Sequence, residues 1–162
     1  MELLLVRHAI AAPAEPGERD FDRVLTEDGA RRFAEVVSGL AGVGLELDRI
    51  LTSPLPRAVQ TGELMTGLLR RDGQLLESDL LAEPPDHALL SAIDSEDESR
   101  VALVGHEPWM STLCAWLVTG RIDPAINLGF KKGGVAWLAG QPRPMGAVLK
   151  AFLPPRVSRH LD

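Results

Sequence analysis

The sequence predicts an α/β fold, a single three-layer domain in which helices flank a mostly parallel central sheet. Two short apolar runs, Glu2–Val6 and Arg100–Val104, are typical of strands buried on both faces. The segments between and after them carry apolar residues at helical spacing, and such an alternation favours a parallel sheet. The length of 162 residues suits one domain.

The first third of the chain is predicted to form a strand, a long loop, a helix and a second strand. Glu2–Val6 is the strand, and the Pro- and Gly-bearing segment Ala11–Gly17 marks the loop. Thr26 is a favourable N-cap, and the apolar positions after it keep helical spacing until Gly42. The second strand lies at Arg49–Thr52.

The remaining elements alternate in the same way as far as Val118. A helix is expected to open at Pro54 and Pro56 and to continue to Leu68. Proline suits this place, because it lacks an N–H and a first-turn N–H has no intrahelical partner. The elements expected after it are a strand at Gln74–Leu81, a short helix at Asp86–Ile93, the strand Arg100–Val104, a helix at Pro108–Val118 and an antiparallel strand pair at Gly134–Ala139 and Ala147–Leu153. We expect residues 1–153 to form the domain and residues 154–162 an irregular C-terminal tail.

Composition excludes several classes of function. A formal net charge of -6 and a pI near 5.2 disfavour nucleic acid and anionic membranes as partners, because both need a positive field. The single cysteine, Cys114, forms neither an intramolecular disulfide nor a thiolate metal cluster, so a cytoplasmic location is expected. The longest uncharged run, Pro108–Gly120, has 13 residues and is too short to span a bilayer.

Three predicted strands end in residues suited to anion binding. Arg7 and His8 follow the first strand, Arg57 lies just after the second, and His106 ends the Arg100–Val104 strand. In open α/β sheets ligands bind beyond the carboxyl ends of the strands, so these side chains are expected to meet at one rim. Taken singly, each has a structural alternative: a hydrogen-bonded histidine at 8, a solvated arginine at 57, or a helix cap at 106.

Phosphate is the anion that best fits two arginines and two histidines. A guanidinium matches phosphate oxygens in bidentate fashion, and the N–H groups at a helix N-terminus add to the cradle. A neutral imidazole can attack phosphorus and form a covalent phosphohistidine. The arginines would supply the charge that Mg²⁺ supplies elsewhere, so neither a metal nor a cofactor is expected.

Four motifs resemble, in order and location, those of the histidine phosphatase superfamily, also called the phosphoglycerate-mutase-like group. They are Leu5-Val6-Arg7-His8-Ala9, Leu25-Thr26-x-x-Gly29, Ser53-Pro54-x-x-Arg57-Ala58-x-Gln60-Thr61 and Gly105-His106-x-Pro108. The chain is most similar to the SixA-type phosphohistidine phosphatase branch, whose members are also short and lack large cap segments. The resemblance implies a phosphoglycerate-mutase-like fold and a histidine-phosphatase-like catalytic domain at residues 1–153.

The resemblance also implies roles for the four strand-end residues. His8 is the nucleophile that becomes phosphorylated, and Arg7 and Arg57 hold phosphoryl oxygens. His106 is the second histidine, which stabilises charge on the transferring group.

Five further positions bear on the site. Ala9 stands where the superfamily usually has glycine, which puts the local backbone geometry in question. Ser53 and Thr61 contribute hydroxyl or backbone contacts to substrate, or serve as caps and packing residues. Glu83 matches in rough position the general acid of mutase-like relatives and Asp22 is its rival, while both also fit solvated carboxylates.

The choice of general acid affects which substrate is expected. An imidazole leaving group needs less acid assistance than an alkoxide, so protein phosphohistidine is the expected substrate, and a histidine phosphotransfer domain is a partner implied by resemblance. A small-molecule phosphomonoesterase or mutase acting on a phosphorylated metabolite is the alternative, and a non-catalytic phosphate-binding module is a second. Lys131-Lys132 either extends the positive rim toward substrate or forms a solvated turn.

Overall fold

The computed structural model describes residues 1–14, 17, 19–95, 97–123 and 125–161. Its strands are β1 (Glu2–Arg7), β2 (Leu47–Thr52), β3 (Leu69–Glu77), β4 (Arg100–Gly105), β5 (Val135–Gly140) and β6 (Ala147–Leu153). Its α-helices are α1 (Glu27–Gly42), α2 (Pro56–Leu64), α3 (His87–Ile93), α4 (Trp109–Thr119) and α5 (Pro155–Ser158). Short 3-10 helices are η1 (Asp20–Asp22), η2 (Thr66–Leu68) and η3 (Asp79–Leu81).

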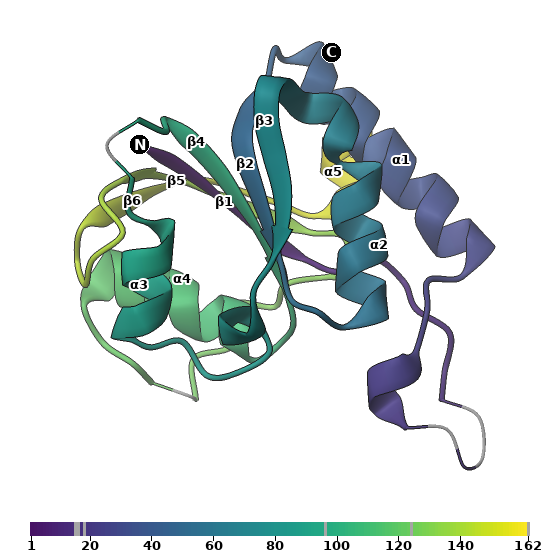
Figure 1. Ribbon diagram of the computed structural model, residues 1–162, viewed down its shortest axis with the longest axis horizontal. Coiled ribbons are helices and arrows are strands. Elements are labelled where there is room, and N and C mark those ends of the chain that lie inside the picture. Colours follow the sequence, from purple (N-terminus) through teal and green to yellow (C-terminus); the bar gives the residue numbers. More distant parts are fainter. Residues whose placement is uncertain (15–16, 18, 96, 124, 162) are drawn as a thin grey trace.

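The strands form one mixed sheet in the order β3-β2-β4-β1-β5-β6 (Figure 1). The pairs β1–β4, β4–β2 and β2–β3 are parallel, whereas β5 is antiparallel to β1 and β6 is antiparallel to β5. The predicted α/β class and the antiparallel pair at the C-terminal end are confirmed.

Helices cover both faces of the sheet because its central strands are apolar on both sides. Leu3 and Leu5 of β1 pack into the cluster formed with α3 and α4, while Leu4 and Val6 pack into the cluster formed with α1 and α2. Figure 1 shows these two pairs of helices on opposite sides of the strands. Successive residues of a strand point to opposite faces, so this uninterrupted apolar run fills two cores.

Two expected boundaries are wrong. The third strand is Leu69–Glu77 rather than Gln74–Leu81, and Asp79–Leu81 is the 3-10 helix η3. The polar start of β3 obscured the strand, because an edge strand exposes much of its length and does not need a continuous apolar pattern. The helix expected to reach Leu68 ends at Leu64, where Gly67 lies within the following 3-10 turn and disfavours a longer α-helix.

The C-terminal segment is more regular than the tail expected from its prolines. Pro155–Ser158 form α5, which packs against α1. Gly39 of α1 lies directly under the carbonyl of Ser158, and any side chain at that glycine would overlap this oxygen. Leu161 packs against the α1 and α2 side of the core. These contacts close the α1 face of the sheet.

The parallel strands end level with one another at their carboxyl ends. Arg7 of β1 pairs with Gly105 of β4, and Thr52 of β2 pairs with Val104 of β4. The predicted N-cap of α1 is confirmed, since the Thr26 hydroxyl accepts a hydrogen bond from the Gly29 N–H at 2.9 Å. The residues that follow β1, β2 and β4 therefore lie at the same edge of the sheet.

Leu4→Ala is expected to lower the free energy of unfolding by about 2 to 5 kcal/mol, because the truncation leaves a cavity in a close-packed core. Leu4 is fully buried in the central strand β1. Leu149→Ala on the edge strand β6 is the matched control, since Leu149 is 38% exposed. Urea denaturation of both variants checks this expectation, and equal losses would contradict the assignment of Leu4 to the core.

Candidate active site

The ends of β1, β2 and β4 bring the expected site residues together. The His8 N–H donates to the Gly105 carbonyl at 3.0 Å, and the Ser53 N–H donates to the Val104 carbonyl at 2.9 Å. The imidazole rings of His8 and His106 lie with their centroids 5.1 Å apart. Both rings are buried, as is the side chain of Arg57 from the first turn of α2.

The hydrogen bond of His8 fixes its tautomer. Nδ1 lies 2.7 Å from the Ala9 carbonyl oxygen, which only accepts hydrogen bonds, so Nδ1 carries the proton and Nε2 keeps a lone pair. Burial lowers the pKa of His8 from 6.5 to about 3, and the cationic Arg57 and Arg7 act in the same direction. At neutral pH His8 is therefore an uncharged imidazole with a free nucleophilic nitrogen.

Ala9 fits the backbone at the position where glycine is usual. It is buried and adopts no positive φ, the backbone conformation that would require glycine. Its N–H donates to the Thr61 hydroxyl at 3.0 Å, and that hydroxyl donates to the Arg57 carbonyl at 2.6 Å. Thr61 thus links the residue after His8 to the first turn of α2.

His106 is oriented by Ser53. Its Nε2 lies 2.8 Å from the Ser53 hydroxyl, while Nδ1 is buried and has no hydrogen-bond partner among the described residues. Burial lowers the pKa of His106 from 6.5 to about 4, with Arg57 and Arg7 contributing in the same direction. Ser53 is fully buried, so its hydroxyl is committed to the local network.

Both arginines are anchored by main-chain carbonyls. Arg7 Nη1 donates to the Phe130 carbonyl at 2.6 Å, and Arg57 Nη1 donates to the Asp20 carbonyl at 2.7 Å. The Nε atoms of Arg7 and Arg57 are buried without a partner among the described residues. His106 Nδ1 is likewise buried and unpartnered, and Arg7, Arg57 and His106 lie near enough to His8 for their charges to act on it. Buried polar groups without partners are costly unless something binds them.

The cation of Arg57 stands at an unfavourable end of its helix. A positive charge in the first turn opposes the helix dipole. Burial lowers the pKa of Arg57 from its ordinary value, although a guanidinium remains charged at neutral pH. An anion bound between this guanidinium and the N-terminus of α2 would be stabilised by both.

Asp20 is a site neighbour that sequence reasoning missed. Its carboxylate accepts from Arg57 Nη2 at 3.2 Å and from Arg23 Nη1 at 2.6 Å. The hydrogen bond from Arg23 holds the pKa of Asp20 below its usual value, so this carboxylate is ionised at neutral pH. Arg23 also donates to the Ala12 carbonyl at 2.6 Å, which fastens the loop that carries Asp20.

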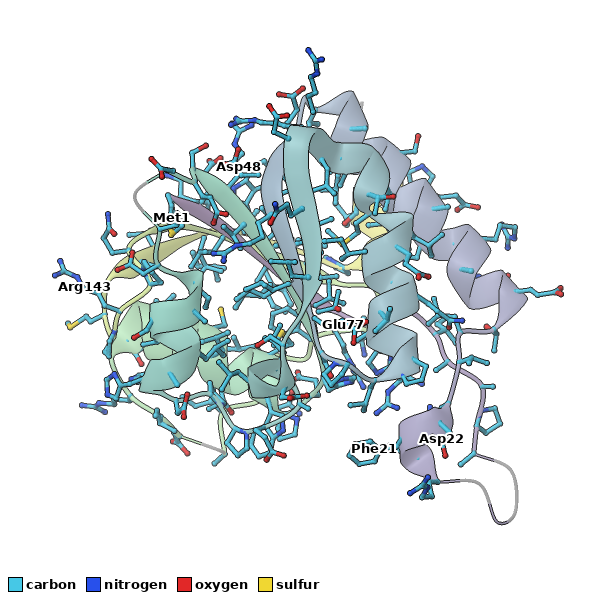
Figure 2. The ribbon with its side chains drawn as sticks, viewed as in Figure 1. Met1, Phe21, Asp22, Asp48, Glu77 and Arg143 are labelled. Atoms are coloured by element: carbon cyan, nitrogen blue, oxygen red, sulfur yellow. The ribbon has the colours of Figure 1, made fainter. Side chains whose placement is uncertain are left out.

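The two expected acids lie outside this hydrogen-bonded cluster. Asp22 forms an exposed pair with Arg19 at 3.5 Å, on the η1 turn that projects from the body of the molecule (Figure 2). Glu83 is exposed just after η3, and within the described residues no hydrogen bond or ion pair engages its carboxylate. The Leu81 carbonyl lies close to Gly105, so the chain segment that carries Glu83 passes beside the end of β4.

The described residues contain neither a metal-binding cluster nor a membrane-spanning helix. No group of three or more His, Cys, Asp or Glu side chains there is arranged to hold a metal ion. No helix in that part of the chain has the length and apolar content needed to cross a membrane.

Acidification from pH 7 to 5 is expected to destabilise the fold. The pKa values of His8 and His106 are lowered in the folded state. Below about pH 6.5 these histidines are therefore protonated in the unfolded chain but remain neutral in the folded chain, which favours unfolding. The stabilisation is complete above that pH and is lost as the pH falls toward 3. Urea denaturation at pH 7 and 5 should show a smaller pH effect for His8→Gln than for the wild type. Equal effects would mean that His8 titrates normally in the fold.

Comparisons with known proteins identify relatives of this chain. The model of the histidine phosphatase superfamily (branch 1) matches residues 3–83. The phosphohistidine phosphatase SixA of Escherichia coli K12 is 28% identical over 131 residues, covering 78% of this chain and 80% of that protein.

Two solved structures share the fold over nearly the whole chain. The protein histidine phosphatase SixA complexed with tungstate superposes with a TM-score of 0.79 at 25% identity, covering 96% of this chain and 98% of that one. SixA from Agrobacterium tumefaciens superposes with a TM-score of 0.73 at 34% identity, covering 95% and 97%. The chain belongs to the histidine phosphatase superfamily.

Proposed function

We propose that this chain is a metal-independent phosphatase that forms a covalent phosphohistidine on His8 and acts on protein phosphohistidine. One observation carries the proposal. The nucleophilic Nε2 of His8 belongs to a cluster in which Arg7 Nε, Arg57 Nε and His106 Nδ1 are buried and unpartnered among the described residues. In the proposed complex these groups donate to the oxygens of a phosphoryl group bound at Nε2.

The proposed reaction has two displacements at phosphorus. The Nε2 lone pair forms an N–P bond as the P–N bond to the substrate imidazole breaks, and the departing imidazole keeps that electron pair and takes up a proton from solvent. Water then attacks phosphorus, and the bond to His8 breaks with its electron pair returning to Nε2. Phosphate leaves with the protons of the water, so His8 is neutral again. Arg7, Arg57 and His106 stabilise the charge on the equatorial oxygens in both steps, which is the part that a metal performs in other phosphoryl transferases.

Ser53 is proposed to act through His106 as a positioning residue. The contact at 2.8 Å between its hydroxyl and Nε2 occupies that ring nitrogen and leaves Nδ1 without a partner among the described residues. If the hydroxyl donates its proton to Nε2, the proton of the neutral ring stays on Nδ1, where it can donate to a phosphoryl oxygen.

The substrate class follows from the acid that the site offers. Asp20 is the carboxylate bound to Arg57, and it is ionised at neutral pH, so it is a poor proton donor. Glu83 is the remaining candidate acid, and its exposed carboxylate lies on the segment beside β4. An imidazole leaving group needs little acid assistance, whereas an alkoxide needs much. Two named SixA relatives also favour a phosphohistidine substrate.

A substrate comparison tests the proposal. Turnover of a phosphohistidine protein is expected to exceed that of sugar and nucleotide phosphates, and Glu83→Gln should leave it within about twofold. Faster turnover of the alkoxide substrates, lost in Glu83→Gln, would instead assign a small-molecule phosphomonoesterase or mutase with Glu83 as acid. Stoichiometric binding without turnover would assign a phosphate-binding module.

A further inference from the structure

A hollow lies on the α1 side of the sheet, and its lining begins with the two residues that follow His8. It has a volume of about 340 Å³, within the range of about 300 to 1,000 Å³ typical of ligand pockets. Its floor is apolar and includes Ile10, Phe33 and Val36. We call it the basic-rimmed pocket, because its border carries Arg32, Lys131, Lys132, Arg156 and Arg159.

The basic-rimmed pocket is lined by residues that adjoin the candidate active site along the chain. Ala9 and Ile10, which line it, directly follow His8. The Cα of Ile10 is therefore at most about 7.6 Å from that of His8. On the other side, the Gly133 N–H lies 3.0 Å from the carbonyls of both Arg7 and His8. The pocket and the candidate active site therefore share the chain segment around His8.

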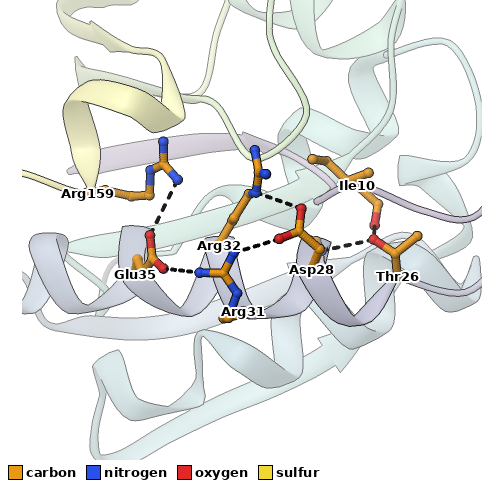
Figure 3. A network of polar contacts seen from close by, with 8 residues as sticks. Ile10, Thr26, Asp28, Arg31, Arg32, Glu35 and Arg159 are labelled. Atoms are coloured by element: carbon orange, nitrogen blue, oxygen red, sulfur yellow. Dashed lines mark hydrogen bonds and ion pairs between the residues drawn. The ribbon is translucent and has the colours of Figure 1, made fainter.

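The rim concentrates positive charge in a protein whose net charge is -6. Arg32 pairs with Asp28 at 2.7 Å and Arg159 with Glu35 at 3.4 Å, along the exposed side of α1 (Figure 3). For Lys131, Lys132 and Arg156 no ion pair to a carboxylate occurs within the described ranges. Burial lowers the pKa of Lys132, and the positive charges of Arg23, Arg7 and Arg57 lower it further. The charge of Lys132 therefore interacts with the arginines of the candidate active site.

We propose that the basic-rimmed pocket docks the segment of the phosphorylated partner protein that adjoins its phosphohistidine. The segment carries an apolar side chain, which enters the floor, and Asp or Glu residues on either side, which meet the rim. The apolar floor favours the apolar side chain, and the cationic border favours the Asp or Glu residues. This inference rests on the proposed function, and it adds the chemistry by which a protein substrate is recognised.

Peptide substrates test the proposal. The probes are three synthetic peptides of equal length with one chemically phosphorylated histidine: one with flanking Glu and a Leu, one with Glu replaced by Gln, and one with Leu replaced by Ser. Wild-type kcat/KM is expected to be about tenfold higher for the first peptide than for the second, and about fivefold higher than for the third. Raising the salt from ~0.05 to ~0.5 M should abolish the preference for Glu.

A charge-removal variant locates the preference. The double variant Arg32→Gln with Arg156→Gln should lose the preference for the Glu peptide through KM, while turnover of free phosphohistidine stays unchanged. The matched control is Arg71→Gln with Arg143→Gln, which removes the same charge from exposed positions, with Arg143 on the far side of the sheet from α1 (Figure 2). Unchanged turnover of free phosphohistidine also shows that the variants are folded.

The outcomes separate the two proposals. Equal rates on all three peptides, or a preference that survives in the pocket variant, overturn docking and leave the phosphatase proposal standing. Failure to hydrolyse free phosphohistidine and all three peptides overturns both. A wild-type dimer in sedimentation that the pocket variant abolishes would mean that a second copy of the chain covers the pocket, which also overturns docking.

Discussion

Replacing His8 by alanine is expected to reduce kcat on any phosphohistidine substrate by at least about 10³-fold, because the group that bonds to phosphorus is gone. His8 supplies the neutral Nε2, and burial with two neighbouring guanidiniums keeps it unprotonated. The buried donors around it remain in the variant, so phosphate binding should weaken far less than kcat. Single-turnover kinetics and phosphate titration of the same protein measure the two effects.

His160→Ala is the control for this variant. His160 is exposed near the C-terminus, where Leu161 approaches the last turn of α1 at the end away from the strand-end cluster. Its removal should leave kcat within about twofold, as is usual for surface substitutions. If His8→Ala hydrolysed phosphoramidates as fast as the wild type, another group would have to be the nucleophile.

Arg57→Lys is expected to lower kcat by about 10² to 10³-fold, comparable to the loss of one oxyanion donor. Lysine keeps the charge but lacks the planar fork, so it cannot hold the Asp20 carbonyl and present Nε to a phosphoryl oxygen at the same time. The kcat of the folded variant, checked by circular dichroism, measures the effect.

Arg70→Lys is the matched control for that substitution. Arg70 also binds an aspartate, Asp48 at 2.6 Å, but it lies at the start of the edge strand β3 rather than at the carboxyl ends of the strands. Its kcat should stay at the wild-type value. Equal losses in the two variants would indicate that Arg57 acts through stability rather than on the phosphoryl group.

The central part of the fold could be predicted because the strands β1 and β4 are short and apolar between their ends. β1 and β4 have no polar residue between their ends, so their positions and burial followed from the sequence. β3 could not be placed correctly, since an edge strand with polar residues lacks that pattern. α5 was missed for a similar reason, because its four residues are too few to show a period.

Part of the candidate site could likewise be predicted from the sequence and part could not. Arg7 ends the strand β1, His8 and His106 follow buried strands, and Arg57 opens a helix, so the strand order brings them to one rim. Asp20 belongs to a loop whose path depends on tertiary contacts, among them its own contact with Arg57. No periodic pattern marks such a residue.

The contact between Arg7 and the Phe130 carbonyl could not be predicted from the sequence either. This carbonyl accepts the hydrogen bond that orients Arg7, and it lies in the irregular segment before β5. A backbone group carries no sequence signature, so this contact becomes visible only in the folded chain.

Trapping the phosphorylated enzyme tests the central claim most directly. The protein is mixed with ³²P-labelled phosphoramidate, quenched in alkali within milliseconds, digested, and the labelled peptide is sequenced. We expect an alkali-stable, acid-labile label on His8, absent from His8→Ala and retained in His160→Ala. Release of phosphate at the normal rate with no label on His8, or with the label on another residue, would contradict the account.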